Sequence, residues 1–208
     1  MNQIEKYFNE LKTLQMIETE SGNFLTTKTY ECKLNNGEII KREKILKNGG
    51  SGSASIILPI TEDNKVILAV EPRVFTKRTV DVGLPAGYIE KNETALDAAK
   101  RELLEETGYT TDEFVSLGSF YQDQACSEAY NHYFVALHCK KVKEQKLDKG
   151  EFIKYILVDF EEIDCLIEKG YIGGLNSIYA LEKGKNYLKK KWYLCIKIEK
   201  EKIQYLQI

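Results

Sequence analysis

Residues 87–108 read GYIEKNETALDAAKRELLEETG, and this stretch decides how the chain folds. Thr94 is a good helix N-cap and the acid Asp97 follows three positions later, so the pattern predicts a helix that begins there. Gly108 can take the left-handed conformation that ends a helix, so the predicted helix stops at Thr107. One apolar stripe of this helix is expected to face the core, and it consists of Leu96, Ala99 and Leu103.

The last two turns of the predicted helix hold three glutamates, which are Glu102, Glu105 and Glu106. Residues three and four apart share a helix face, so these carboxylates repel one another. They also lie near the helix C-terminus, where the macrodipole disfavours negative charge. A bound divalent cation removes both penalties, and ligands that are all oxygen favour Mg²⁺ or Mn²⁺. The sequence therefore predicts a metal site on this helix.

Two further groups complete this predicted metal site. Arg101 lies four residues before Glu105, so it can hold that carboxylate in place while the others bind metal. Gly87 permits a close backbone approach before the helix, and the Ala86 carbonyl can supply one more oxygen ligand. The competing interpretation is a helix with solvated acids. It fails on specificity, because seven fixed identities match a given window with odds on the order of 10⁻⁸.

These identities are Gly, five residues, Glu, seven residues, Arg-Glu, an apolar residue, any residue, Glu-Glu, any residue, Gly, and they resemble the Nudix box. The resemblance implies an α/β/α sandwich. It also implies that Glu102 and Glu106 are the main metal ligands. Glu105 would be a further ligand with a catalytic role, and Glu93 a structural acid. Water would attack one phosphorus of a diphosphate whose charge the metal neutralises.

Residues 66–108 further resemble the ADP-ribose pyrophosphatase branch of that family, which has an apolar strand and a Leu-Pro-Ala-Gly entry to the box. The branch places a Gln-aromatic-Arg step between the two, and this chain reads Glu71-Pro72-Arg73 there. Arg73 is therefore the candidate phosphate contact, since a guanidinium can grip a phosphate through two hydrogen bonds. The resemblance also implies a homodimer built through an N-terminal β-hairpin.

Two loops after the box carry the remaining candidates. In the branch a loop acid before a late strand supplies the general base, and Glu151 matches it within residues 146–153. The loop 121–128 ends in the Ser-Glu pair of the branch, so Glu128 is a candidate substrate contact. The proline that the branch often has in this loop is absent. Cys126 lies in the same loop, but thiol chemistry is not what the box indicates.

The pattern around the box predicts an α/β fold with a mixed sheet and a small N-terminal β appendage. Residues 1–50 form the appendage, with a helix over 1–13 and a hairpin that turns at Asn36-Gly37. Residues 51–208 form the hydrolase domain. Its strands are expected at 55–59, 65–70, a short one ending at 84, 114–121, 132–139 and 153–158. Its later helices are expected at 161–169 and 175–188, and the weak alternation at 192–198 is compatible with a final strand.

Bulk composition argues against several classes of protein. A net charge of −2 on 208 residues disfavours a nucleic-acid binder, an RNA-decapping enzyme included. The longest apolar runs, such as Val66–Val70, are too short to cross a membrane. Five scattered cysteines without a CxxC pair indicate reduced thiols and a cytoplasmic location.

Two alternatives to an ADP-ribose pyrophosphatase stay open. The box sets the reaction and other loops choose the substrate, so a nucleotide sugar or a dinucleoside polyphosphate is also compatible with the sequence. A Nudix domain can also bind a nucleotide as a sensor without cutting it. The presence of Glu102, Glu105 and Glu106 together favours the enzyme, since binding alone would tolerate their loss.

Overall fold

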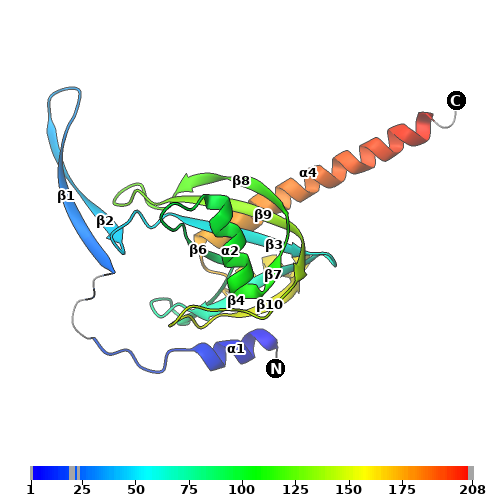
Figure 1. Ribbon diagram of the computed structural model, residues 1–208, viewed down its shortest axis with the longest axis horizontal. Helices are drawn as coiled ribbons and strands as arrows, with labels where there is room; N and C mark the ends of the chain where they lie inside the picture. The colour runs from blue at the N-terminus through cyan, green and yellow to red at the C-terminus, as the bar shows by residue number, and fades with distance from the viewer. Residues whose placement is uncertain (1, 19–21, 23, 206–208) are drawn as a thin grey trace.

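The computed structural model describes the backbone of residues 2–18, 22 and 24–205, with side chains up to residue 190 (Figure 1). Its helical elements are α1 (Gln3–Leu11), α2 (Ala95–Thr107), η1 (Phe160–Glu162, a 3-10 turn), α3 (Ile163–Glu168) and α4 (Leu175–Tyr205). Its strands are β1 (Leu25–Lys33), β2 (Ile39–Lys47), β3 (Ala54–Thr61), β4 (Lys65–Pro72), β5 (Val80–Gly83), β6 (Ala86–Tyr88), β7 (Tyr109–Thr110), β8 (Glu113–Tyr121), β9 (Tyr130–Lys141) and β10 (Lys154–Asp159).

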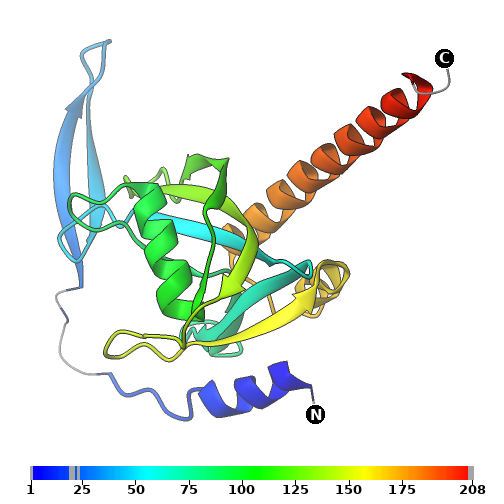
Figure 2. The same ribbon diagram turned by 45° about the vertical axis from the view of Figure 1, so that its right-hand side comes forward.

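A mixed sheet forms the middle layer of the molecule, in the order β10-β4-β3-β9-β7, with β5 beside β4, β6 beside β3 and β8 beside β9. β3 and β9 run parallel, whereas the other neighbours run antiparallel. α2 packs on one face, and α1, α3 and α4 pack on the other (Figures 1 and 2). The predicted α/β sandwich with a mixed sheet is confirmed.

Strand β3 shows how the alternation of side chains builds two cores, because successive residues of a strand point to opposite faces. Ile56, Leu58 and Ile60 belong to the core shared with α1, α3 and α4. Ile57 belongs to the core beneath α2, together with Leu103. β3 is apolar throughout for this reason, as expected of a strand that is covered on both faces.

The sheet divides between β3 and β4, and this division positions the site. The register of β3 with β4 holds a single pair, Ile60 with Val66, beside their connecting turn. Farther along, β3 pairs with β6 and β4 pairs with β5. Leu84 and Pro85 carry the chain from β5 to β6 and thus across the division. All four strands contribute residues to the cleft described below.

Helix α2 begins and ends where the sequence predicts. The Thr94 side chain accepts the Asp97 backbone N–H at 3.1 Å, and Gly108 ends the helix with φ of 76°. The prediction that Leu96 faces the core is wrong, because this side chain is 37% exposed while Ala98 is buried. Periodicity gives the direction of a side chain but not how far the sheet extends beneath the first helical turn.

The predicted N-terminal hairpin is confirmed. β1 pairs antiparallel with β2 from Leu25↔Lys47 to Lys33↔Ile39, and Gly37 takes a φ of 89° in the turn. The hairpin extends away from the sandwich on the side opposite to the free end of α4 (Figures 1 and 2). None of the described helices is long and apolar enough to span a membrane.

Three elements differ from the sequence prediction. The strand at 192–198 is wrong, because α4 continues through this segment to Tyr205. The segment Trp192–Ile198 continues a helix that begins at Leu175, whereas a strand would need a sheet edge to pair with. β6 and β7 were not predicted, since strands of three and two residues are defined by distant pairing partners rather than by a local pattern.

We expect Gly108→Ala to lower the free energy of unfolding by about 2–4 kcal/mol. A methyl group there would lie 2.0 Å from the Lys143 carbonyl oxygen, and φ of +76° is strained for any L-residue. Gly170→Ala is the matched control, because Gly170 has φ of +69° with nothing within 4 Å, and should lose about 1 kcal/mol. Urea unfolding measures both, and equal losses would contradict the close contact at Gly108.

Candidate active site

A cleft of about 2000 Å³ opens at the division between β3 and β4. The residues that line it include Glu71, Arg73, Tyr88, Glu102, Glu106 and Glu151. The base of the N-terminal hairpin and the segment after α1 border the same cleft, through Lys47 and Thr13. The volume exceeds the roughly 300–1,000 Å³ of ordinary small-molecule sites, so the cleft can hold an extended ligand.

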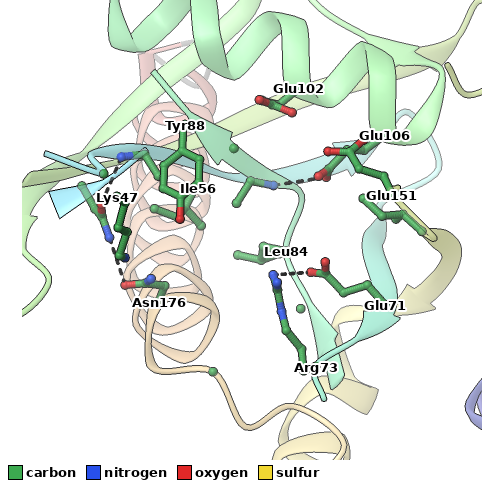
Figure 3. A pocket seen from close by; sticks show the side chains of 18 of the residues that line it. Lys47, Ile56, Glu71, Arg73, Leu84, Tyr88, Glu102, Glu106, Glu151 and Asn176 are labelled. Carbon is green, nitrogen blue, oxygen red and sulfur yellow. Dashed lines mark hydrogen bonds and ion pairs between the residues drawn. The ribbon is translucent and has the colours of Figure 1, made fainter. Parts of the chain in front are cut away.

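Four carboxylates from three separate parts of the chain converge in this cleft (Figure 3). Glu102 and Glu106 come from α2, Glu71 from the end of β4, and Glu151 from the loop before β10. β10 pairs with β4 through Lys154 and Val70, and this register brings the Glu151 loop beside Glu71. Sheet pairing therefore assembles acids that lie as much as eighty positions apart.

Burial of these acids is energetically unfavourable for their charged forms. Glu106 is 6% exposed, and burial raises its pKa well above the usual range, with the charges of Glu102, Glu71 and Glu151 raising it further. Burial likewise raises the pKa of Glu102, although Arg101 partly offsets the effect. Within the described part of the chain, Glu106 has one hydrogen-bond donor, the Ala86 N–H at 3.2 Å, and no cationic partner.

Arg101 organises the acids along the outer edge of the site. Its guanidinium contacts Glu93 at 2.9 Å, Glu102 at 2.6 Å and Glu105 at 3.3 Å, and it donates to the Tyr88 carbonyl at 3.0 Å. Hydrogen bonds to Glu93 are the main reason why the pKa of Arg101 is raised, and the same bonds lower the pKa of Glu93. Glu105 faces Arg101 and is not among the residues that line the cleft.

The glycine before α2 makes room for one of these carboxylates. A Cβ atom on Gly87 would lie 1.8 Å from Oε1 of Glu102, so any larger residue would displace that group. Both residues line the cleft, beside the Ala86 position that was predicted from the sequence. The loop before α2 can therefore approach the helix closely because Gly87 has no side chain.

Arg73 lies in the cleft but is engaged by a residue that the sequence analysis did not single out. Its guanidinium contacts Glu71 at 2.6 Å (Figure 3). Burial raises the pKa of Glu71, and Arg73 partly offsets this. The signal for Glu71 was available, since it stands where the resemblance calls for glutamine. Its place in the acidic cluster could not be predicted without knowing that β10 brings Glu151 to the same end of β4.

The two loop candidates have different surroundings. Glu151 lines the cleft, and its carboxylate accepts the Asp148 N–H at 2.9 Å within its own turn. Glu128 is not among the lining residues and instead pairs with Lys44 of β2 at 3.0 Å. The adjacent Cys126 carbonyl accepts the Ile45 N–H at 2.8 Å. The loop 121–128 thus contacts the hairpin, and the structure does not bring Glu128 together with the other candidates.

The sequence pattern of the NUDIX domain matches residues 51–180, well over half of the chain. The chain belongs to the Nudix hydrolase family. An ADP-ribose pyrophosphatase of Bacillus subtilis (strain 168) is 32% identical to it over 174 residues, which cover 83% of this chain and 91% of that protein. A methanol dehydrogenase activator of Bacillus methanolicus is 30% identical over 178 residues, which cover 85% and 93%.

The fold of this Nudix hydrolase also matches a solved structure. The crystal structure of an ADP compounds hydrolase superposes with a TM-score of 0.71 at 21% sequence identity, covering 87% of this chain and 96% of that one. Identity at this level supports the fold rather than the substrate. The architecture predicted from residues 87–108 is therefore that of the family.

The donor set of this Nudix hydrolase suits a hard divalent cation. Glu102 and Glu106 offer buried carboxylate oxygens in a cluster of like charge, and oxygen ligands favour Mg²⁺ or Mn²⁺. The side chains are directed to other partners, Glu102 to Arg101 and Glu106 to the Ala86 N–H. In this arrangement no three acidic, thiol or imidazole side chains among the described residues surround a common metal position. Metal binding would therefore require the acidic side chains to move closer together.

We expect Gly87→Ala to lower the turnover of this Nudix hydrolase by about 10²-fold, because the new methyl group displaces the Glu102 carboxylate. The thermal midpoint should change little, since the displaced atoms are the free end of a side chain. Steady-state hydrolysis and thermal unfolding of the same preparation separate the two effects. Turnover within twofold of the parent would contradict a role for the position of Glu102.

Proposed function

We propose that this Nudix hydrolase cleaves the pyrophosphate of a nucleoside diphosphate derivative, and specifically ADP-ribose to AMP and ribose 5-phosphate. The observation that carries the proposal is the convergence of Glu102, Glu106 and Glu151 with Arg73 in one cleft. The substrate assignment is supported by the relative from Bacillus subtilis, whose name is ADP-ribose pyrophosphatase and which matches along nearly its whole length.

Mg²⁺ or Mn²⁺ held by Glu102 and Glu106, with Glu105 and the Ala86 carbonyl as further ligands, would supply the positive charge that offsets the diphosphate. The residues of the chain do the rest. Arg73 would grip a phosphate through two hydrogen bonds from the guanidinium N–H groups that Glu71 does not occupy. Glu151 accepts the proton of the attacking water, and it has a second carboxylate oxygen besides the one that accepts the Asp148 N–H.

The other end of the cleft suits the groups attached to the diphosphate. Tyr88 is 46% exposed and faces the cleft, with the Lys47 ammonium 5.9 Å from its ring centre (Figure 3). Lys47 also donates to the Gln122 side chain at 3.2 Å. An aromatic ring beside a cation can bind a base or the face of a sugar. The metal-binding acids and Arg73 lie at the opposite end, where the diphosphate would bind (Figure 3).

We also propose that 51–208 are the hydrolase domain and that the hairpin within residues 1–50 is a dimerisation appendage, whereas α1 of the same range packs on the domain through Ile4 and Phe8. Of the side chains on β1 and β2, Leu46 alone is buried, while Leu25, Tyr30 and Ile39 are exposed. An isolated two-stranded hairpin is at best marginally stable in water. A second copy of the chain that covered these exposed side chains would stabilise the hairpin. The exposure therefore supports the homodimer that the family resemblance implies.

The substrate is tested by measuring phosphate release with Mg²⁺ and a coupled phosphatase, for ADP-ribose, nucleotide sugars, dinucleoside polyphosphates and NADH. We expect ADP-ribose to have the highest kcat/KM. Preference for another member would keep the reaction and discard ADP-ribose. Tight binding of nucleotides without cleavage of any would favour the sensor.

Glu106→Gln should reduce turnover by at least about 10³-fold with its fold intact, and residual activity within a few-fold of the parent would contradict the metal assignment.

Glu151→Gln tests the general base separately. We expect kcat to fall by about 10²–10⁴-fold, because the amide cannot accept the proton of water, while the affinity for substrate changes little. Pre-steady-state hydrolysis and equilibrium binding of ADP-ribose measure the two quantities. Glu113→Gln is a matched control, since Glu113 is a glutamate of β8 that does not line the cleft. Normal turnover of Glu151→Gln would move the base to another residue.

A further inference from the structure

The C-terminal end of α2 is covered by the segment that follows β9, residues 142–146. The last four carbonyls of a helix have no partner within the helix. Here the Gly108 carbonyl accepts the Val142 N–H at 2.9 Å, and the Glu105 carbonyl accepts the Lys146 N–H at 2.9 Å. Figure 2 shows the chain between β9 and β10 passing beneath this end of α2. The helix that carries the acids is therefore capped by a segment far along the chain.

One side chain of this segment makes contacts of a different kind. The Gln145 amide nitrogen donates to the Glu106 carbonyl and, at 3.2 Å, to the Ile153 carbonyl. A primary amide has two hydrogens, so a single nitrogen can serve both acceptors. Gln145 is half-buried between exposed neighbours, which sets it apart from the rest of the segment. The amide joins α2 directly to the chain that enters β10.

The two carbonyls that Gln145 joins belong to the two halves of the site. Glu106 is the most buried acid of α2, and Ile153 lies two residues after Glu151. Ile153 is itself buried, whereas Gly150, Glu151 and Phe152 are exposed. The Gln145 amide therefore holds the buried end of the Glu151 loop at a set distance from the acids of α2. A cap alone would need only the hydrogen bond to the Glu106 carbonyl, so the second bond, to Ile153, serves another purpose.

We infer that Gln145 is a positioning residue for hydrolysis, which fixes the Glu151 loop against α2 so that the base meets the water beside the substrate phosphate. This inference rests on the proposed function, because it assigns Glu151 as the general base. A loop acid on a turn of exposed residues has many positions open to it, and a misplacement of about 1 Å can lower turnover by 10²-fold. The amide acts on the reaction through Glu151 and does not touch the substrate.

The test is Gln145→Met, which keeps the length of the side chain and removes both donors. We expect kcat for ADP-ribose to fall by about 10–100-fold with KM within about threefold. In a Glu151→Gln background, the same substitution should lower kcat by less than about twofold, because the base through which it acts is gone. A purely structural role predicts equal losses in both backgrounds, and equal losses would overturn the inference.

Lys141→Met is the matched control. Lys141 is the last residue of β9, directly before this segment, and it also reaches β10, since its ammonium donates to the Tyr155 hydroxyl at 2.7 Å and to Glu144 at 3.2 Å. The substitution therefore removes two side-chain contacts, as Gln145→Met does, but those of Lys141 join β9 to β10 and to Glu144, away from α2 and Glu151. We expect its kcat to stay within about twofold of the parent. If Lys141→Met slowed turnover as much as Gln145→Met, a general loosening of the segment would replace the inference.

Hydrogen exchange gives a readout that does not depend on the substrate. Amides of residues 148–153 should exchange faster in Gln145→Met than in the parent or in Lys141→Met. Unchanged exchange would overturn the inference even if the enzyme were active. If the parent cleaved nothing, the proposed function would fail while exchange still decided whether Gln145 holds the loop. If Gln145→Met does not fold, Gln145→Asn is measured in its place, because its shorter amide can keep only one of the two bonds.

Discussion

Buried negative charge is the constraint on which the rest of the site depends. Glu106 lies almost wholly out of water, and Glu102, Glu71 and Glu151 are the charges that act on it. Removing a carboxylate from water without a partner costs several kcal/mol, so such a group is retained only where something compensates it. Arg101 compensates the outer acids and Arg73 compensates Glu71, but Glu106 has one backbone N–H among the described residues. A divalent cation with its substrate phosphates is the natural complement of this arrangement.

The division of the sheet provides the place where this charge can be used. β3 and β4 share one residue pair and then take different partners, so the strand ends around Glu71 and Ala86 border a cleft instead of a continuous sheet. α2 packs on Ile57 and Ile67 by its apolar side, which turns its acidic side toward this opening. The same amphipathic helix thus contributes to the core and to the site, and neither role can change without the other.

Two contacts join the loops of this site to its helix. The absent side chain of Gly87 lets the loop before α2 approach Glu102, and the Gln145 amide joins the end of α2 to the chain after Glu151. Both act on geometry rather than on charge. They explain how a helix, a loop and a strand end that fold as separate elements can present their carboxylates to a single substrate.

The sequence by itself determined the helix from Thr94 to Gly108, its acids, the alternating strands and the hairpin turn at Gly37, because each depends on residues a few positions apart. Only the tertiary structure decided that Leu96 is exposed, that β6 and β7 exist, that residues 192–198 are helical, and that Glu128 contacts the hairpin. It also decided the surroundings of Glu71 and Gln145, whose partners lie on other elements. Local patterns report which face a side chain takes, whereas its contacts depend on which distant strands pair.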